Sequence, residues 1–216
     1  MILADVHREY ESRLEVFGLF DTSECTMREF IGPVLIGAIR LMGDRRIKIE
    51  SDQIIEGRRG RGPVDYDVVL RHFHIVVCEV KNGADVISGI PQNGAQLLAS
   101  REMFQNIQIK KRSLENEIEL REELDKLPSF GIVSTGYSWV FICYYKDSDG
   151  KWQLKRSSLS RLPLSEKPEE RAGLKVRIQS LLGIVVGIML AQKDAVEEFE
   201  RTADCKRPRT SSTGEL

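Results

Sequence analysis

The feature that most constrains the fold is a stretch of the chain, residues 73–81, that is almost wholly apolar until it ends in Glu79 and Lys81. A near-continuous apolar run of this length is typical of a strand that is buried on both faces. Such strands lie inside sheets that helices cover on both sides. The sequence therefore predicts that residues 73–81 form the central strand of a mixed sheet with helices on both faces.

The charges at the end of this strand point to a polar site. Side chains alternate along a strand, so Glu79 and Lys81 share one face, with Val80 between them. The preceding strand begins with two acids, Asp65 and Asp67, and a tight connection would bring it alongside. The sequence thus predicts two carboxylates and an ammonium at one sheet edge. Hard divalent cations prefer oxygen ligands, and a neighbouring lysine can position or deprotonate an attacking water.

These residues resemble a known nuclease motif. Asp65, followed by Glu79-Val80-Lys81, resembles the PD-(D/E)xK superfamily, whose core is the restriction-endonuclease-like fold. The wider wording, Arg-Gly-Pro-Val-Asp-Tyr at 61–66 and Gly-Ile-Pro-Gln-Asn at 89–93, is similar to the nuclease-like C-terminal domain of Crinkler-type effectors of fungi and oomycetes. The resemblance implies a Mg²⁺-dependent DNA endonuclease, in which Mn²⁺ substitutes for Mg²⁺.

The resemblance also assigns roles at the strand ends. It implies that Asp65 and Glu79 bind the metal with help from the Val80 carbonyl. Lys81 would activate water for in-line attack on a phosphodiester. Asp67 is the alternative first ligand because it shares a face with Asp65, although Asp65 follows Pro-Val as the acid of the family does.

Two helices are expected to contribute further side chains. The resemblance implies that a helix glutamine after Glu-x-Lys contacts the site or the DNA, and Gln92 and Gln96 match this position on one helix face. The alternative is that both are ordinary surface amides of the helix. In many family members the first core helix supplies another acid, for which Glu29 is a candidate and Glu24 fits nearly as well. A solvated first-turn glutamate, favoured by the helix dipole, is the alternative.

A local basic segment is the candidate DNA contact. The formal net charge of the chain is −1, so no global basic signal points to nucleic acid, and a local basic surface must supply the contact. The glycine-rich loop expected at residues 56–62 carries Arg58, Arg59 and Arg61. Guanidinium groups match phosphate oxygens in a bidentate way, although a flexible, solvated loop has the same composition.

The order of the expected elements matches the αβββαβ core of the restriction-endonuclease-like fold, an α/β fold with a mixed sheet flanked by helices. The expected helix, three strands, helix and strand are residues 22–42, 47–55, 64–70, 73–81, 91–104 and 130–134. A second, amphipathic helix is expected within residues 107–128, with Ser113 as its cap. The chain is therefore divided into an N-terminal helical extension (1–21), the nuclease-like domain (22–201) and a disordered basic tail (202–216).

The cysteines and histidines allow a competing metal site. The four cysteines are scattered without a Cys-x-x-Cys pair, which argues against a disulfide scaffold or zinc finger and suits a reducing compartment. His72, His74 and Cys78 share a strand face, and imidazole and thiolate are good zinc ligands. A core strand packed beneath a helix explains the same pattern.

Location and partners follow from short segments. No signal peptide is visible, and the apolar run at 181–191 is too short for a membrane span, so no membrane partner is expected. Residues 206–209, Lys-Arg-Pro-Arg, resemble a minimal nuclear import signal, which predicts a nuclear or intracellular location, the host nucleus for an effector. DNA is the expected partner, and the oligomeric state stays open, a dimer included.

Two other functions are compatible with this sequence. The first is a catalytically inactive module of the same fold that binds DNA or a protein partner, since a fold does not fix a function. A degenerate site would usually have lost an acid or the lysine, and here all three persist. The second is an α/β protein in which Glu79 and Lys81 form a surface ion pair. It predicts that Asp65, Glu79, Lys81 and Gln96 are not gathered at one place.

Overall fold

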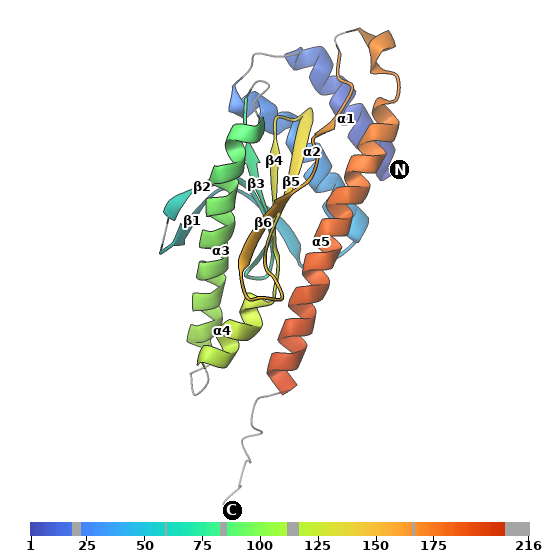
Figure 1. Ribbon diagram of the computed structural model, residues 1–216. Coiled ribbons are helices and arrows are strands. Elements are labelled where there is room, and N and C mark those ends of the chain that lie inside the picture. Colours follow the sequence, from blue (N-terminus) through green and yellow to red (C-terminus); the bar gives the residue numbers. More distant parts are fainter. Residues whose placement is uncertain (19–22, 59, 83–85, 112–116, 166, 206–216) are drawn as a thin grey trace, which may run out of the picture.

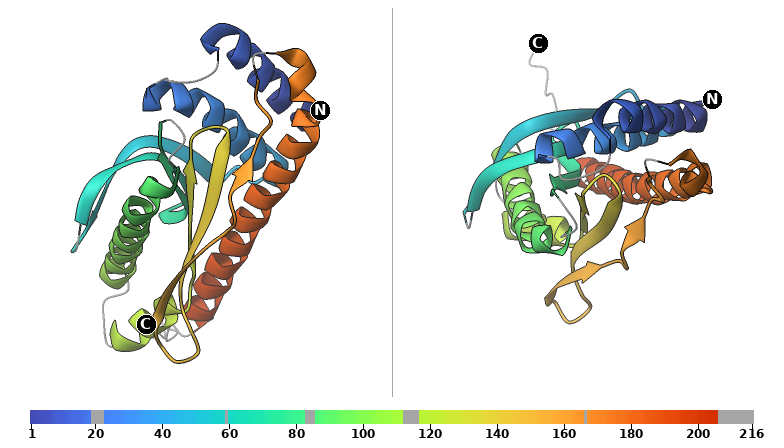
Figure 2. Two further views of the ribbon diagram at one scale, coloured as in Figure 1. Left: turned by 45° about the horizontal axis from the view of Figure 1, so that its top comes forward. Right: turned by 90° about the horizontal axis from the view of Figure 1, so that it is seen from above.

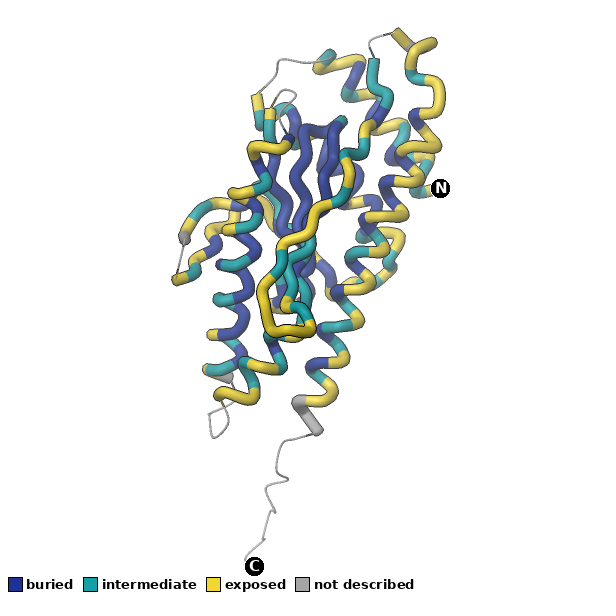
Figure 3. The backbone as a smooth tube through the Cα atoms, in the orientation of Figure 1, coloured by how far each residue is buried: buried dark blue, intermediate teal, exposed yellow. Residues whose placement is uncertain are grey.

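Strand β3 (Phe73–Val80) lies at the centre of the sheet, as its apolar run predicts (Figure 1). It pairs antiparallel with β2 (Gly60–Leu70) and parallel with β4 (Ser129–Ser134). Seven of its eight residues are buried, and the central strands are almost entirely enclosed (Figure 3). The computed structural model describes residues 1–18, 23–58, 60–82, 86–111, 117–165 and 167–205. The predicted α/β class, a mixed sheet flanked by helices, is confirmed.

The sheet has seven strands in the order β1-β2-β3-β4-β5-β6, and β7 pairs with β5 off this path. Every pair except β3–β4 is antiparallel. The remaining strands are β1 (Ile47–Gly57), β5 (Ser138–Lys146), β6 (Trp152–Arg156) and β7 (Ser160–Arg161). Strand β7 is short, with only two residues.

Helices cover both faces of this sheet (Figure 2). Helix α3 packs on one face, while α2 and α5 lie on the other and α1 packs against them. The helices are α1 (Ile2–Phe17), α2 (Glu24–Met42), α3 (Gly89–Lys111), α4 (Glu117–Asp125) and α5 (Leu174–Cys205). Two 3₁₀ turns, η1 (Val86–Ser88) and η2 (Pro168–Arg171), precede α3 and α5.

The side chains of β3 contribute to two different cores. Val76 and Cys78 belong to the larger core beneath α1, α2 and α5, whereas Val77 belongs to the smaller core beneath α3. The smaller core also holds Leu97 of α3 and Val133 of β4. This division is the physical reason why the strand is apolar on both faces.

Helix α2 begins and ends at the residues its sequence favours. The hydroxyl of Ser23 accepts a hydrogen bond from the Thr26 N–H, which satisfies a free donor of the first turn. Gly43 ends the helix with a φ of 67°, the left-handed conformation that glycine adopts without strain. Pro33 lies in the interior of the helix and not in its first turn, where a proline is common.

The connection between β3 and β4 differs from the expected arrangement. The sequence predicts a helix over residues 91–104 and a second helix within 107–128. Helix α3 instead runs on to Lys111, because residues 105–111 contain neither glycine nor proline to stop it. Helix α4 is accordingly short, with nine residues, and Ser113 lies outside the described residues.

The basic connection before β2 is tighter than a loop over residues 56–62. Gly57 of β1 pairs with Gly60 of β2, so the connection between the two strands is only two residues long. Arg61 is therefore a strand residue. A Cβ atom at Gly57 would lie 2.7 Å from the Ala99 Cα atom, so glycine lets this hairpin approach α3.

The ends of the chain join the larger core. Tyr10 of α1 is fully buried, and its hydroxyl donates a hydrogen bond of 3.2 Å to the Gly136 carbonyl. Helix α5 contains a segment, Leu174–Thr202, that is long and apolar enough to cross a membrane by length and composition alone. The same helix fills the larger core with Ile178, Leu181, Leu182, Val185, Met189, Val196 and Phe199. The predicted basic signal at 206–209 lies outside the described residues.

Candidate active site

Polar side chains from β2, β3 and α3 meet where the central strand ends. Asp65 lies on β2, Glu79 on β3 and Lys81 directly after it, while Gln92 and Gln96 come from the start of α3. Hydrogen bonds link all five, either directly or through the Val80 main chain. The gathering is the one that an isolated surface ion pair between Glu79 and Lys81 would not produce.

Asp65 is held from two sides. Its Oδ2 atom accepts a hydrogen bond of 2.7 Å from the Val80 N–H, and its Oδ1 atom pairs with the Arg28 guanidinium. The side chain is 12% exposed. The Val80 carbonyl was expected as a metal ligand, and the structure adds a second role for this residue, because its N–H fixes the first carboxylate.

Glu79 is buried, and each of its two carboxylate oxygens accepts a hydrogen bond. Its Oε1 atom accepts a hydrogen bond of 2.5 Å from Lys81 Nζ, and its Oε2 atom accepts one of 2.6 Å from Gln96 Nε2. Burial raises the pKa of Glu79, and the neighbouring Asp65 charge raises it further, while the hydrogen bonds from Lys81 and Gln96 oppose the shift. The two carboxylates therefore repel each other, which is the condition under which a cation between them is favourable.

Lys81 is a cation whose position is fixed by hydrogen bonds. Its Nζ atom also donates a hydrogen bond of 3.0 Å to Gln92 Oε1 and lies 3.7 Å from Glu24 Oε1. Burial by itself lowers the pKa of Lys81, but the hydrogen bond and the charge of Glu79 outweigh it and raise the pKa. Lys81 is thus protonated at neutral pH, and it can orient a water or stabilise negative charge but is not a free base.

Helix α3 is placed by close packing on the sheet. Gln92 and Gln96 are four residues apart and so share the face that meets Lys81 and Glu79. Asn93 anchors this turn because its Nδ2 atom donates to the Val77 carbonyl at 3.0 Å and to Gln96 Oε1 at 3.3 Å. A Cβ atom at Gly131 would collide with Asn93 Oδ1, so glycine in β4 permits the contact. Sequence reasoning gave Asn93 no role of its own.

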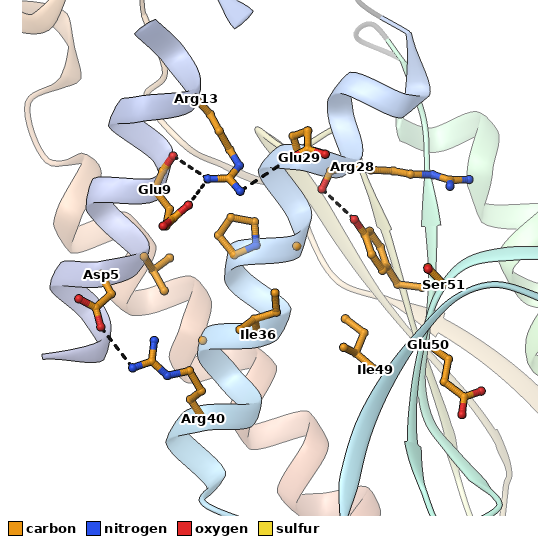
Figure 4. A pocket seen from close by; sticks show the side chains of 15 residues that line it. Asp5, Glu9, Arg13, Arg28, Glu29, Ile36, Arg40, Ile49, Glu50 and Ser51 are labelled. Atoms are coloured by element: carbon orange, nitrogen blue, oxygen red, sulfur yellow. Dashed lines mark hydrogen bonds and ion pairs between the residues drawn. The ribbon is translucent and has the colours of Figure 1, made fainter. Parts of the chain in front are cut away.

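Of the two acids considered on α2, Glu24 approaches Lys81 and Glu29 does not. The Glu29 Oε2 atom instead lies 3.7 Å from Arg13 Nη2 of α1 (Figure 4). The reason is helical phase. Glu24 and Arg28 are four residues apart and share the face toward the sheet, whereas Glu29 is rotated by about 100° from Arg28.

Arg28 and Asp52 belong to the site and were missed by sequence reasoning. Arg28 Nη1 donates a hydrogen bond of 2.6 Å to Asp52 Oδ1, while its Nη2 atom pairs with Asp65. Ser51 pairs with Tyr66 and Gln53 with Val64, so Asp52 lies opposite Asp65 in the β1–β2 ladder. Like charges in facing positions destabilise a sheet, and Arg28 offsets that repulsion.

Asp67, the alternative first ligand, lies apart from these contacts. It is fully buried, and its Oδ2 atom pairs with His74 Nδ1. The candidate zinc ligands are also not grouped together, because His74 pairs with Asp67 and His72 is exposed. Within the described residues, no three histidine, cysteine or acidic side chains are grouped as a metal cluster.

Two of the three predicted DNA contacts, Arg58 and Arg61, lie at the hairpin between β1 and β2. Arg58 and Arg61 are exposed, and the Arg58 main-chain N–H donates a hydrogen bond of 2.5 Å to Glu102 Oε2. Arg61 is four residues from Asp65 on the same strand, a separation of roughly 13 Å. Arg59 lies outside the described residues.

A pocket of about 400 Å³ lies behind the site, between α1, α2 and β1 (Figure 4). Its charged rim is internally paired, with Arg40 Nη2 lying 3.3 Å from Asp5 Oδ2. Tyr66 lines it and donates a hydrogen bond of 3.0 Å to the Arg28 carbonyl, and burial raises the pKa of Tyr66 to about 12. The pocket is thus lined by Arg28 but by neither Asp65 nor Glu79.

The donor set of the site fits Mg²⁺. Each oxygen of Asp65 and Glu79 accepts from one protein donor and keeps a second lone pair. Mg²⁺ in proteins is usually bound by one or two carboxylates and completed by water and substrate phosphate. The two carboxylates can therefore hold such an ion without a third acidic ligand.

Comparisons with protein-family models, with curated proteins and with solved structures found no match to this chain.

Proposed function

We propose that this protein is a Mg²⁺-dependent DNA endonuclease of the PD-(D/E)xK type, similar to the nuclease-like domain of Crinkler effectors. One observation carries the proposal: a buried glutamate, a lysine paired with it and a second carboxylate meet at the end of the central strand. They come from the positions that the motif assigns. The order α2, β1, β2, β3, α3, β4 supports it as well.

Each residue then has a defined task. Asp65 and Glu79 would hold the cation, together with the Val80 carbonyl, and the bound cation would supply Lewis-acid activation of water and phosphate. Lys81 orients the attacking water and stabilises the charge that develops on the phosphate in an in-line displacement. Gln96 fixes the Glu79 carboxylate, and a carboxylate held in one geometry loses less entropy when it binds.

DNA is the proposed partner, held through its phosphates. Arg58, Arg59 and Arg61 would neutralise phosphates on one side of the site, since the chain as a whole is not basic. A nuclear location, from the basic run at 206–209, is part of the same proposal. A fluorescent fusion that lacks residues 202–216 should show reduced nuclear accumulation if the run acts as an import signal.

An inactive module that binds DNA or a protein is the second candidate. The observation in its favour is that all four carboxylate oxygens of Asp65 and Glu79 already have protein partners. In an inactive protein these contacts would be a structural network and nothing more. The two candidates differ in what divalent metal does to bound DNA.

Nicking of supercoiled plasmid in Mg²⁺, Mn²⁺ or EDTA tests the proposal. The wild type should nick the plasmid only with metal, and Glu79→Gln should abolish nicking. The matched control is Glu122→Gln, the same change at an exposed position of α4, which should cleave as the wild type does. DNA binding without cleavage by the wild type, unchanged by Glu79→Gln, would instead establish the inactive module.

A further inference from the structure

Arg28 connects two strands of the site from a third element. It projects from α2 to acids on two different strands, Asp52 of β1 and Asp65 of β2. These two acids face each other across the ladder, and Arg28 supplies the positive charge between them. A guanidinium paired with Asp65 Oδ1 places a positive charge at one of the oxygens that a metal ion would use.

The contact is arranged so that Arg28 can leave one of its two acids and keep the other. Asp65 is 12% exposed, whereas Asp52 is 63% exposed and its backbone adopts a left-handed conformation with a φ of 53°. The Arg28 Nε atom is buried without a hydrogen-bond partner among the described residues. The guanidinium is therefore incompletely satisfied where it stands, and Asp52 gives it a partner that does not depend on Asp65.

We propose that Arg28 is a positioning residue that competes with the divalent cation for Asp65. Without metal, Arg28 bridges Asp65 and Asp52. When the cation binds, Arg28 leaves Asp65 and stays on Asp52. This inference rests on the proposed function, because it concerns the metal that the nuclease would use. It assigns Asp52 the task of holding the released guanidinium.

Competition makes a prediction about the sign of each effect. Arg28→Met removes the competitor, so the affinity for divalent cation should rise by about tenfold, within the usual range for coupling between two ligands of one protein. Asp52→Asn removes the partner of the released guanidinium, so the affinity should fall. With Arg28 already replaced, Asp52→Asn should change little, since no guanidinium is left to be held.

Simple long-range electrostatics predicts the same direction of change in metal affinity for each single variant. It predicts a different affinity for the double variant. If Arg28 and Asp52 acted only through their distant charges, the two effects would add. Competition instead predicts that Arg28→Met/Asp52→Asn binds metal nearly as tightly as Arg28→Met alone. Arg28→Lys keeps the charge but cannot span both acids, and it should bind metal with intermediate affinity.

The experiment is a titration of the full chain with Mn²⁺, followed by calorimetry and by the signal of free Mn²⁺ in paramagnetic resonance. No DNA is needed, so activity is not the readout. The matched control is the ion pair Arg46 and Asp44 outside the site, replaced as Arg46→Met and Asp44→Asn, which should leave the affinity unchanged. Circular dichroism and thermal unfolding show whether each variant is folded.

The outcomes separate this inference from the proposed function. If Glu79→Gln weakens Mn²⁺ binding but Arg28→Met leaves it unchanged or weaker, the competition is refuted and the metal site stands. Additive effects of Arg28→Met and Asp52→Asn would also refute it. If neither the wild type nor Arg28→Met binds Mn²⁺, the proposed function is refuted, and the competition is refuted as well. Tighter binding by Arg28→Met, with no added effect of Asp52→Asn, supports it.

Discussion

Asp65 and Asp67 are the same amino acid, two residues apart on one strand, yet they lie in different surroundings. Asp65 accepts from a main-chain N–H of β3 and from a guanidinium of α2, and it is partly exposed. Asp67 is fully buried against His74, and its Oδ1 atom has no partner among the described residues. One carboxylate lies at the polar end of the sheet and the other inside it.

The difference shows what strand alternation does and does not determine. Alternation places both aspartates on one face, but two residues of a strand span roughly 6.6 Å, which is enough to pass from the sheet end into the interior. There the register of β2 and β3 shifts between Val68 and Val69. A buried carboxylate with one imidazole partner supports the fold, whereas a carboxylate at the open end can exchange its partners for a cation.

The largest expected effect tests the catalytic side of this comparison. Lys81→Ala should slow plasmid cleavage by about 10²- to 10³-fold, the usual contribution of one donor that stabilises developing negative charge. Metal binding should not weaken, because Lys81 is not a ligand. Single-turnover cleavage and a Mn²⁺ titration measure the two quantities, with Lys48→Ala on exposed β1 as the control. Equal cleavage by wild type and Lys81→Ala would remove Lys81 from the mechanism.

The second prediction sets the two aspartates directly against each other. Asp67→Ala leaves a buried His74 nitrogen unpaired, so the free energy of unfolding should fall by about 1–3 kcal/mol. Metal affinity should stay the same. Asp65→Ala should do the reverse, abolishing metal binding and cleavage with a smaller change in stability. Urea unfolding and metal titration check both variants, and failure of folded Asp67→Ala to bind metal would make Asp67 the first ligand.

The sequence predicts the fold well where one pattern has one physical explanation. The apolar run at 73–81 has to be buried on both faces, and the structure divides it between two cores. Boundaries are harder to predict where no residue enforces a stop, as at the end of α3. Arg61 was misplaced in a loop because glycines at 57 and 60 mark a two-residue hairpin as well as a longer turn.

Only the local part of the site could be anticipated from sequence. Glu79 and Lys81 are neighbours on one strand, and Gln92 and Gln96 are neighbours on one helix face, so their spacing is informative. Arg28 lies 37 residues from Asp65, and no periodic pattern links them. Asp52 takes a left-handed conformation inside a strand, which propensity does not predict. The four-residue spacing of Glu24 and Arg28 was the one available signal that both face the site.

A third prediction asks whether the exposed end of β2 differs from the site it leads to. Replacing Arg58, Arg59 and Arg61 by glutamine should weaken DNA binding and reduce its dependence on salt, by about 0.9 in the logarithmic slope for each phosphate that is no longer neutralised. Metal affinity should be unchanged, since neither Arg58 nor Arg61 contacts the carboxylates of the site among the hydrogen bonds of the described residues. Fluorescence anisotropy at two salt concentrations measures the slope, with Arg177→Gln on exposed α5 as the control. An unchanged slope would place the DNA elsewhere.

The smallest expected effect comes from a third carboxylate, Asp44, which extends the comparison to an acid with partners outside any site. Hydrogen bonds from the Arg46 side chain and main chain lower the pKa of Asp44 to about 2, whereas burial raises that of Glu79. A lowered pKa in the folded state means that the stabilisation is complete above the ordinary value near 4 and is lost as the pH falls toward 2.

Because Arg46 is half exposed, solvent screens this interaction and the stabilisation should be small. Asp44→Asn should therefore lower the free energy of unfolding slightly at pH 7, and the difference from wild type should shrink as the pH falls below 4. Urea unfolding between pH 7 and pH 3 measures it. A difference that grew toward low pH would mean that Asp44 is protonated in the folded protein. The hydrogen-bond partners of Asp44 would then not explain why it differs from the carboxylates of the site.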